Sequence, residues 1–436
     1  MGSLWSWWTL WAGTILLWGL TQEAQVDPRN SGGEEFLTAF LQNYQPGYNT
    51  PHLYLFISSL SENPALVSIL SQADGTSKTV TVRPGETVMV HISAKAEMTG
   101  SKTFKSAVVV HSDRSIAVQA LNTKPSTAEL TALWPVHSLG TEYFVLTPDG
   151  TSMGNFKEFA VVAGAAGASV SINLKGSVTF KGNFYPAGKV LTVTLQPYEV
   201  AQLQSTADLS GSKVTASHPV AVFSGHSCAQ KHTTCDHVLE QLLPTSAWGT
   251  QYVVPPLASQ SRFDLAYVVA SQTTKLIYNH GGTTRSHGLQ MGDVVKFEVR
   301  PTQPLYLRAD VGIQVLLFGT GSIKNKMTYD PYLVLIPDVT AYCSAYVFKT
   351  VPDSVGVAVM VAQTKAVNGL TINGHTLGAK LAWAPVPGSE FSYAEVDLVT
   401  GDTIHMAEAA TNFGLLIFGL AQAVGYGTAP ACSRSE

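Results

Sequence analysis

The sequence is poor in charge. Only 13% of its 436 residues are Asp, Glu, Lys or Arg, and 26 basic against 30 acidic side chains give a net charge of −4. Neither sign forms a run, so the sequence lacks the basic footprint of a nucleic-acid-binding protein. With 45% hydrophobic residues the chain is too apolar to be disordered, and it is long enough for two or more domains. We therefore expect a globular protein with no nucleic-acid partner.

The sequence also lacks acceptor sites for N-linked glycans and any second apolar segment of membrane length. Its one long apolar run, residues 4–20, contains five of the eight tryptophans and no charge. This run predicts a signal peptide over residues 1–24. The alternative is a signal anchor, because the run is at the lower length limit for a membrane span and no Lys or Arg precedes it. We favour cleavage, and so expect a secreted, extracellular protein with no membrane span.

Cysteines are few, and all four follow the predicted signal peptide. An even number of cysteines in an oxidising compartment is expected to pair. Cys228 and Cys235 are separated by six residues, and His226, His232 and His237 lie beside them, so a zinc site is one alternative. Zinc-binding cysteines are usually two to four residues apart, and we therefore predict a disulfide between Cys228 and Cys235.

Internal repeats provide the main evidence for the fold. A small or polar triplet leads to an aromatic residue at 36, 143, 252 and 346, so that the intervals are 107 (143 − 36), 109 (252 − 143) and 94 (346 − 252) residues. Each unit closes on an apolar segment, at 116–121, 220–223, 313–318 and 415–418. We expect the strand that starts at Pro219 to end in a turn at Gly225.

The segments between these landmarks favour β-structure. Val and Thr alternate with period two, for example in residues 190–195, and glycine- or asparagine-containing turns separate the strand candidates. Residues 34–44 have helical propensity, but their place in the repeat favours a strand. The sequence thus predicts an all-β protein of four tandem antiparallel β-sandwich-like repeats packed together. We place the repeats at residues 25–130, 131–240, 241–334 and 335–436.

The repeat positions predict a second disulfide. Cys343 opens the fourth repeat and Cys432 follows its last strand. If the first and last strands of a sandwich are neighbours, a bond between these cysteines would close the terminal unit. The chain-entropy model assigns about 4 kcal/mol to a loop of this length.

Enzyme motifs are weak throughout the chain. The central His226, Ser227 and Cys228 could serve a secreted hydrolase, but the segment lacks the second glycine and the helix of a nucleophile elbow. The carboxylates Glu34, Glu35, Asp208, Asp293 and Asp397 lie beside turns or at strand edges, and no acid/base pair can be selected among them. We expect no catalytic, metal-binding or cofactor-binding residues and no cofactor.

Four longer segments carry a resemblance to a known family: EEFLTAFLQNY, KEFAVVAGAAGASVSI, YDPYLVLIPDV, and the central stretch DLSGSKVTASHPVAVFSGHSCAQKHTTCDHVLEQLLPTSAWGTQYVVP. Together they resemble the amino-terminal region of the IgG Fc-binding protein family, and the resemblance covers nearly the whole chain. It identifies residues 25–436 as a region of that type.

The resemblance implies a secreted, non-enzymatic binding or structural protein of mucus, with the Fc portion of IgG and mucus components as partners. In that family, cysteine-rich von Willebrand factor D-type assemblies follow this region. They are absent here, so we expect soluble or loosely associated behaviour rather than covalent assembly. A carbohydrate-binding β-sandwich adhesin is the alternative of another class.

Overall fold

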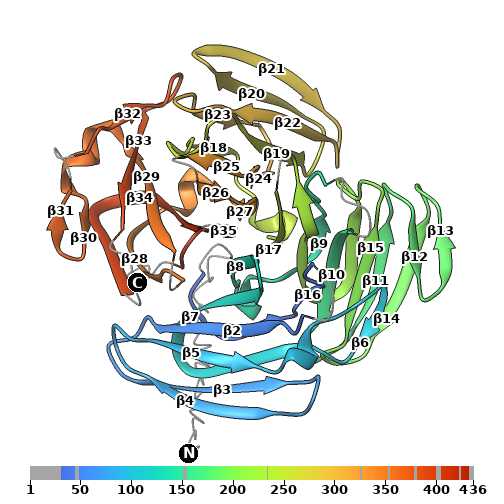
Figure 1. Cartoon of the computed structure of the whole chain (residues 1–436). Coiled ribbons are helices and arrows are strands. Elements are labelled where there is room, and N and C mark those ends of the chain that lie inside the picture. Colours follow the sequence, from blue (N-terminus) through green and yellow to red (C-terminus); the bar gives the residue numbers. More distant parts are fainter. Residues whose placement is uncertain are drawn as a thin grey trace, which may run out of the picture.

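The computed structural model describes residues 31–44, 49–150, 155–232, 234–324, 327–351, 354–377, 381–398, 404–421 and 424–431. The predicted signal peptide, residues 1–24, and Cys432 lie outside these residues. Four β-sandwiches surround a central axis and follow one another around it in chain order, from blue through green and yellow to red (Figure 1). The predicted all-β fold of four packed sandwich repeats is confirmed.

The first sandwich consists of two antiparallel sheets that share the long strand β7 (Val108–Lys124). One sheet has the order β4-β3-β7-β1 and faces the rim, and we call it the rim sheet. The other has the order β5-β2-β7-β8 and reaches the axis, and we call it the axial sheet. The other strands are β1 (Gly33–Thr38), β2 (His52–Ser59), β3 (Ala65–Ser71), β4 (Ser77–Val82), β5 (Thr87–Ile92) and β8 (Thr127–Ala132).

The second sandwich repeats this plan around β16 (Lys213–Gln230). Its rim sheet is β14-β11-β16-β9, and its axial sheet is β15-β10-β16-β17, extended by β6 (Lys102–Phe104) from the preceding segment. A separate hairpin, β12-β13, projects from it. The strands are β9 (Gly140–Phe144), β10 (Lys157–Ala163), β11 (Ala168–Asn173), β12 (Val178–Phe180), β13 (Asn183–Tyr185), β14 (Val190–Leu195), β15 (Val200–Ser205) and β17 (Cys235–Gln241).

In the third sandwich the shared strand is split in two, β23 and β24. The rim sheet is β18-β23-β20-β21 and the axial sheet is β22-β19-β24-β27, with a small hairpin β25-β26. The strands are β18 (Gln251–Val254), β19 (Asp264–Ala270), β20 (Thr274–His280), β21 (Thr283–Leu289), β22 (Val294–Val299), β23 (Leu305–Arg308), β24 (Ile313–Gly319), β25 (Ser322–Lys324), β26 (Met327–Tyr329) and β27 (Tyr332–Leu335).

The fourth sandwich is built around β34 (Ile404–Ala421). Its rim sheet is β31-β30-β34-β28, and its axial sheet is β32-β33-β29-β34-β35. The strands are β28 (Cys343–Lys349), β29 (Val355–Gln363), β30 (Thr371–Ile372), β31 (His375–Thr376), β32 (Ala384–Pro385), β33 (Phe391–Asp397) and β35 (Val424–Thr428). Five short 3₁₀ helices connect strands: η1 (Ala94–Ala96), η2 (Val136–Ser138), η3 (Thr245–Ala247), η4 (Val339–Ala341) and η5 (Thr364–Gly369).

Each axial sheet is buried on both faces. One face packs in its own sandwich and the other packs against the neighbouring sandwich, so the sheet joins the two. All residues of β10 and β19 are buried, which explains why these strands read as continuous apolar runs. In β10, Phe159 and Val161 point into their own sandwich, whereas Ala160 and Val162 belong to the core of the first sandwich. The second and third, and the third and fourth, sandwiches share cores in the same way. We call these three junctions the sequential seams.

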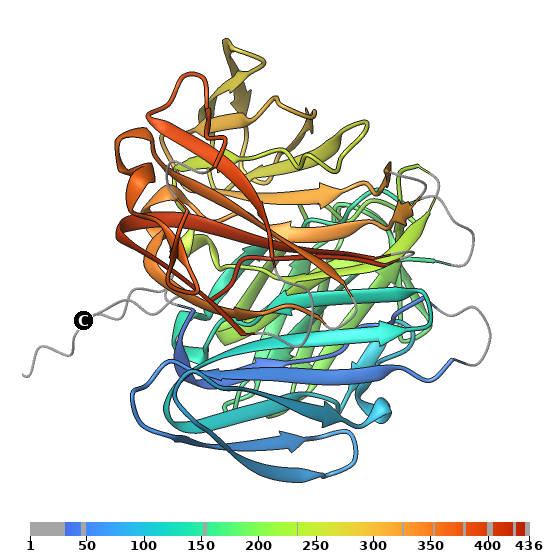
Figure 2. The same cartoon turned by 60° about the vertical axis from the view of Figure 1, so that its left-hand side comes forward.

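A fourth junction closes the ring between the last sandwich and the first (Figure 2). At the axis, β35 lies beside β8, and Tyr426 packs in a small cluster with Phe56, Leu121, Ala128 and Leu130. We call this the closing seam. The inner strands β8, β17, β27 and β35 meet at the axis and are almost entirely buried. The centre of the ring is therefore filled with side chains.

One tyrosine fixes the start of each of the last three sandwiches. The Tyr143 hydroxyl accepts a hydrogen bond from the Gly140 N–H (2.9 Å) and donates one to a carbonyl of β16 (2.6 Å). Tyr252 and Tyr346 make the same two bonds at the matching positions. Phe36 occupies this position in the first sandwich. The recurring aromatic residue seen in the sequence is thus the residue that ties the first rim strand to the long strand.

The predicted turn at Gly225 is wrong, because β16 continues through it to Gln230. A Cβ atom on Gly225 would lie 1.9 Å from the Val238 carbonyl oxygen on β17. The glycine therefore serves a close approach of two strands and does not end one. Residues 34–44 are a strand up to Thr38 and irregular beyond it, so the strand prediction holds for the first part of that segment.

Candidate functional site

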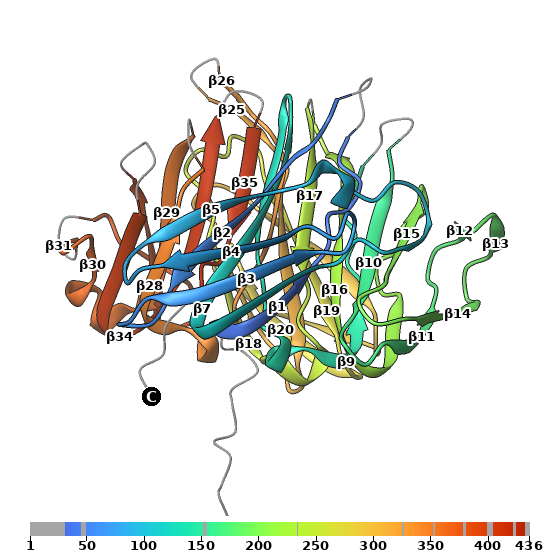
Figure 3. The same cartoon turned by 90° about the horizontal axis from the view of Figure 1, so that it is seen from below.

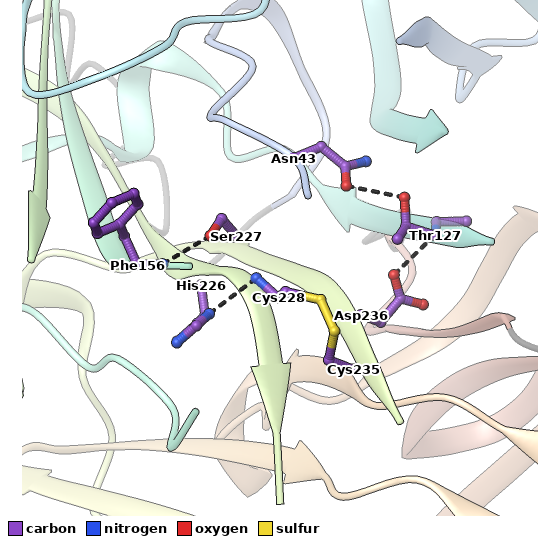
Figure 4. The surroundings of a disulfide bond; sticks show 9 residues. Asn43, Thr127, Phe156, His226, Ser227, Cys228, Cys235 and Asp236 are labelled. Carbon is purple, nitrogen blue, oxygen red and sulfur yellow. Dashed lines mark hydrogen bonds between the residues drawn. A yellow bond between two sulfur atoms is a disulfide. The ribbon is translucent and has the colours of Figure 1, made fainter. Parts of the chain in front are cut away.

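The central stretch of the sequence forms the hairpin of β16 and β17. The end of this hairpin that carries Cys228 and Cys235 lies near the axis, on the face of the ring that we call the loop face (Figures 3 and 4). Cys228 and Cys235 form a disulfide with a Cα–Cα distance of 5.1 Å, as predicted. The pairing of the two strands shifts between His226 and Ala229, so Cys228 lies in a β-bulge. The disulfide thus fixes the irregular end of the hairpin.

The three histidines of this stretch point to different partners. His226 Nδ1 accepts a hydrogen bond from the Cys228 N–H (2.9 Å), and His237 lies 3.5 Å from the Asn122 amide. His232 stands at the hairpin tip, edge-on to the Phe263 ring, with 5.3 Å between ring centroids. The two sulfurs that would bind zinc are bonded to each other, so neither is available as a thiolate ligand.

The hydrolase alternative requires Ser227 to be activated by a neighbouring base. Its Oγ instead accepts a hydrogen bond from the Phe156 N–H (2.8 Å), and its side chain is buried (Figure 4). The Nδ1 atom of His226 is occupied by the Cys228 backbone. Both side chains therefore hold the bulge in place, and the arrangement does not form a nucleophile and its base.

A buried polar network lies beneath the hairpin, between the first two sandwiches. Lys124 Nζ is 2.7 Å from Glu97 Oε1, and both side chains are nearly inaccessible to solvent. Asn43 joins the pair, because its N–H donates to Glu97 (2.9 Å) and its carbonyl accepts from Lys124 (3.2 Å). Burial raises the pKa of Glu97 although Lys124 opposes the shift. A buried pair of this kind specifies one arrangement of the chain more than it adds stability.

Glu158 and His237 extend this network without forming an ion pair. Glu158 Oε1 is 3.9 Å from His237 Nδ1, and Gln204 Nε2 donates to the other Glu158 oxygen (2.7 Å). Burial raises the pKa of Glu158 well above its ordinary value and lowers the pKa of His237 to about 3. At neutral pH the imidazole is therefore uncharged, so this contact is not an ion pair.

Carboxyl groups of β17 bind the other inner strands at the axis. Asp236 accepts hydrogen bonds from the backbone of Ala128 on β8 (3.1 Å) and Gly425 on β35 (3.4 Å). Glu240 accepts from the Leu335 N–H on β27 (3.1 Å) and from the Thr131 hydroxyl on β8 (2.6 Å). Inner strands are sheet edges with unpaired N–H groups, and these two side chains satisfy some of those groups.

These axial carboxyls also interact with one another. Burial, followed by the charges of Glu240 and Asp236, raises the pKa of Glu129 well above its ordinary value, and burial raises the pKa of Glu240 to about 8. Burial and Asp330 likewise raise the pKa of Asp236. Asp236, Glu240 and Glu129 were not among the predicted site residues. Their signal was the position of acidic residues inside otherwise apolar strand segments.

Beside the disulfide hairpin lies an accessible group of side chains that we call the loop-face patch: Lys231, His232, Arg262 and Phe263. Lys231 and Arg262 are exposed, and His232 and Phe263 are half-buried. The first cause of the lowered pKa of His232 is burial, and the second is the charge of Arg262. Asp149 accepts from Lys231 (3.3 Å), which helps to fix the hairpin tip. Arg and aromatic side chains are enriched in protein interfaces.

The remaining residues considered from the sequence do not converge. The carboxylates Glu34, Glu35, Asp208, Asp293 and Asp397 lie on different sandwiches and are exposed or half-buried. Cys343 is disulfide-bonded. Cys432 lies outside the described residues, so its pairing with Cys343 stays a prediction.

Among the described residues, no helix is long and apolar enough to cross a membrane.

Comparisons with known proteins place the chain among its relatives. A family model described as "IgGFc binding protein" matches residues 129–419. A human protein named "IgGFc-binding protein" is 75% identical over 435 residues, an alignment that covers 100% of this chain and 8% of the relative. This chain thus spans a small fraction of the relative's length.

Two solved structures of bacterial adhesins are only remotely similar. One, titled "Structural insight into host cell surface retention of a 1.5-MDa bacterial ice-binding adhesin", has 9% identity and a TM-score of 0.12, with coverage of 66% of this chain and 90% of that chain. The other, titled "Ca2+-stabilized adhesin helps an Antarctic bacterium reach out and bind ice", has 10% identity and a TM-score of 0.14, with coverage of 93% of this chain and 100% of that chain. At these TM-scores neither likeness carries an argument.

Proposed function

We propose, from the premise that this chain belongs to the IgGFc-binding protein family, that it is a secreted, non-enzymatic binding protein of mucus whose first ligand is the Fc portion of IgG. The observation that carries the proposal is the 75% identity over the whole chain to the human protein of that name. Since the chain spans 8% of that relative, Fc binding by this segment alone is the point that needs testing.

The geometry supports a binding role because it provides a rigid platform. The cores are shared across the sequential seams, so the four sandwiches present their loops in fixed relative positions. The disulfide holds the central hairpin at one end of this platform. Pre-organised loops lose less conformational entropy when they bind a partner.

We place the Fc-facing surface at the loop-face patch. Arg262 is exposed and the neighbouring Phe263 is half-buried against the core of the second sandwich, so the patch combines a cation with an aromatic side chain in a fixed position. Arginine and aromatic residues are the side chains that most often dominate the binding energy of protein interfaces. The disulfide hairpin then forms one border of the contact surface.

The proposal is tested by measuring the binding of the purified protein to immobilised Fc and Fab fragments of IgG. Binding to Fc and not to Fab is the expected result. Arg262→Glu should weaken Fc binding at least about tenfold, which corresponds to about 1.4 kcal/mol. Arg83→Glu is the matched control, because the Arg83 side chain is 75% exposed and lies on the first sandwich, far along the chain from the patch.

Failure of the unsubstituted protein to bind Fc would overturn the proposed function. If both variants bind Fc as well as the unsubstituted protein, the Fc site lies elsewhere on the ring.

A further inference from the structure

The hairpin of β12 and β13 projects from the rim of the second sandwich (Figures 1 and 3). It forms a two-stranded sheet of its own, and its turn is made by Lys181 and Gly182, both with positive φ. Phe184 on this hairpin is 68% exposed, the highest value among the large apolar side chains that the structure describes. An aromatic ring held in water on a projecting hairpin contributes nothing to a core.

Two hydrogen bonds fix the hairpin against the neighbouring strands. The Lys181 N–H donates to the Ser101 carbonyl (2.9 Å), directly before β6. The Ser205 hydroxyl at the end of β15 donates to the Ser177 carbonyl (2.6 Å) at the base of the hairpin. The hairpin tip therefore lies beside the start of β6, which pairs with β15.

The segments of this surface are rich in cations, and the acidic residues Glu97, Asp113 and Glu199 lie directly outside them. Residues 98–112 and 173–198 contain five lysines and no Asp or Glu, in a protein whose net charge is −4. Lys102, Lys105 and Lys181 are exposed, and none of them forms an ion pair in the described part of the chain, where the lysine pairs involve residues 124, 213, 231 and 296. Their charge is therefore available to a ligand.

Two of these cations lie over aromatic rings of their own segments. Lys102 Nζ is 5.2 Å from the centroid of the Phe104 ring, and Lys181 Nζ is 5.7 Å from that of Phe180. Cation–π contacts at exposed sites are worth about 0.5–1 kcal/mol, which is enough to bias where a long side chain rests. The two ammonium groups are thus held near rings of their own segments and not spread at random.

The use of lysine instead of arginine favours a flexible anionic polymer over a protein as the ligand. All the cations are lysines, and protein interfaces are depleted in lysine and enriched in arginine. Lysine acts as a hydrated point charge and does not need the planar bidentate partner that arginine selects. Repeated anionic groups on a flexible polymer suit such a set, and an exposed aromatic ring offers an apolar face to the C–H face of a sugar.

We propose that Lys102, Lys105, Lys181 and Phe184 form a binding site for an anionic polysaccharide that carries sulfate or carboxylate groups. The site is separate from the loop-face patch and goes beyond the proposed Fc binding. The lysines supply attraction that depends on salt concentration, and Phe184 supplies contact area that does not.

The test uses the full chain and a heparin-derived octasaccharide as probe, with uncharged dextran of similar length as the comparison. The variant Lys102→Gln/Lys105→Gln/Lys181→Gln should weaken octasaccharide binding at least about tenfold. It should also reduce the slope of log K against log[salt] by roughly two to three, since each neutralised contact releases about one counterion. Phe184→Ala should weaken binding severalfold and leave that slope unchanged.

The matched control is Lys95→Gln/Lys275→Gln/Arg285→Gln, which removes the same charge from exposed positions elsewhere. It should bind the octasaccharide like the unsubstituted protein. Equal losses in the two triple variants, equal binding of dextran, or no binding by the unsubstituted protein would overturn the proposal. Tighter binding of a single-stranded oligonucleotide of matched charge would also overturn it, in favour of a nucleic-acid site.

Fc binding measured on the same variants separates this proposal from the preceding one. Both triple variants should bind Fc as the unsubstituted protein does. A protein that binds Fc but not the octasaccharide refutes only the polysaccharide site, and the reverse result refutes only the proposed function.

Discussion

The sequential seams and the closing seam join the same kind of sandwich in different ways. At the first sequential seam, Ala160, Val162, Phe223 and Leu239 of the second sandwich are part of the core of the first. At the closing seam, Tyr426 is the one residue of the fourth sandwich in a cluster of five buried apolar residues. Neighbours along the chain therefore share cores, whereas the two ends of the ring meet through a small contact.

This difference means that sandwiches adjacent in sequence are held together by more apolar contact than the first and the last sandwich are. The Tyr426 hydroxyl accepts from the Val351 N–H within its own sandwich (2.9 Å), and Asp236 of the second sandwich accepts from Gly425. The closing seam thus relies on the Tyr426 ring and on the partly buried Val351 and Val424, and Asp236 links β35 to β8 from the second sandwich. Apolar area removed from water is worth about 25 cal/mol per Å², so the larger shared cores should dominate stability.

The largest expected effect comes from removing a sequential seam altogether. A fragment of residues 25–133 should be poorly soluble and should not unfold cooperatively, because its core includes side chains of the second sandwich. Circular dichroism during thermal unfolding and size-exclusion chromatography measure this. A monomeric fragment with a cooperative transition would show that the first sandwich is independent.

Phe223→Ala tests the same seam within the full chain. Phe223 is completely buried in the core shared by the first two sandwiches, and its truncation should lower the free energy of unfolding by about 3–5 kcal/mol. Phe184→Ala, at a 68% exposed position, is the control and should change stability by less than about 0.5 kcal/mol. Similar losses in the two variants would contradict the importance of the shared core.

Removal of the disulfide should have an intermediate effect. In Cys228→Ser/Cys235→Ser, the loss of a bond that closes a short loop should cost about 2 kcal/mol, since the cysteines are seven residues apart. The melting temperature of the unsubstituted protein should not change when a chelator is added. Stoichiometric zinc together with free thiols at both positions would reverse the assignment.

Tyr426→Phe tests how the ring at the closing seam is held within the fourth sandwich. It keeps the ring but leaves the Val351 N–H without its partner, so we expect a loss of about 1–2 kcal/mol, less than for Phe223→Ala. Hydrogen exchange should also become faster in β35 and β8 and stay unchanged in β10. A variant that loses as much stability as Phe223→Ala would show that holding this one ring in place matters as much as a residue of a shared core.

The effect that is smallest per step, here one pH unit, concerns the axial carboxyls. Burial raises the pKa of Glu240 from 4.5 to about 8, so its contribution to stability is fully present below pH 4.5 and is lost as the pH rises through 8. Stability should fall by about 1 kcal/mol per pH unit in this window. Glu240→Gln should flatten that slope in denaturant unfolding measured at pH 5, 6.5 and 8, and an unchanged slope would show that Glu240 does not titrate there.

The sequence predicted the repeated units because each unit carries its own local signals. The aromatic residue near the start of each unit is visible in sequence since it recurs at similar spacing, and the tyrosines among these make the same two hydrogen bonds in the structure. The ring was not predicted, because nothing local to β35 records that β8 lies beside it.

The central site was predicted in part. The spacing of Cys228 and Cys235 was sufficient for the disulfide, which depends on two nearby residues. The partners of Asp236 could not be predicted, since it binds backbone groups of residues 108 positions before it and 189 positions after it. Gly225 was misread because a close approach of two strands and a turn both select glycine.

Each sandwich shares its core with the next one along the chain, and this affects how the chain folds during its synthesis. Each axial sheet completes the sandwich before it, so the chain can fold from its amino-terminal end as it emerges, with every finished unit serving as a template for the next. The first sandwich is the exception, since Phe56 and Leu130 stay uncovered until β35 has been made. For most of translation the nascent protein therefore carries one exposed apolar site, which a chaperone could bind and which the arrival of Tyr426 removes.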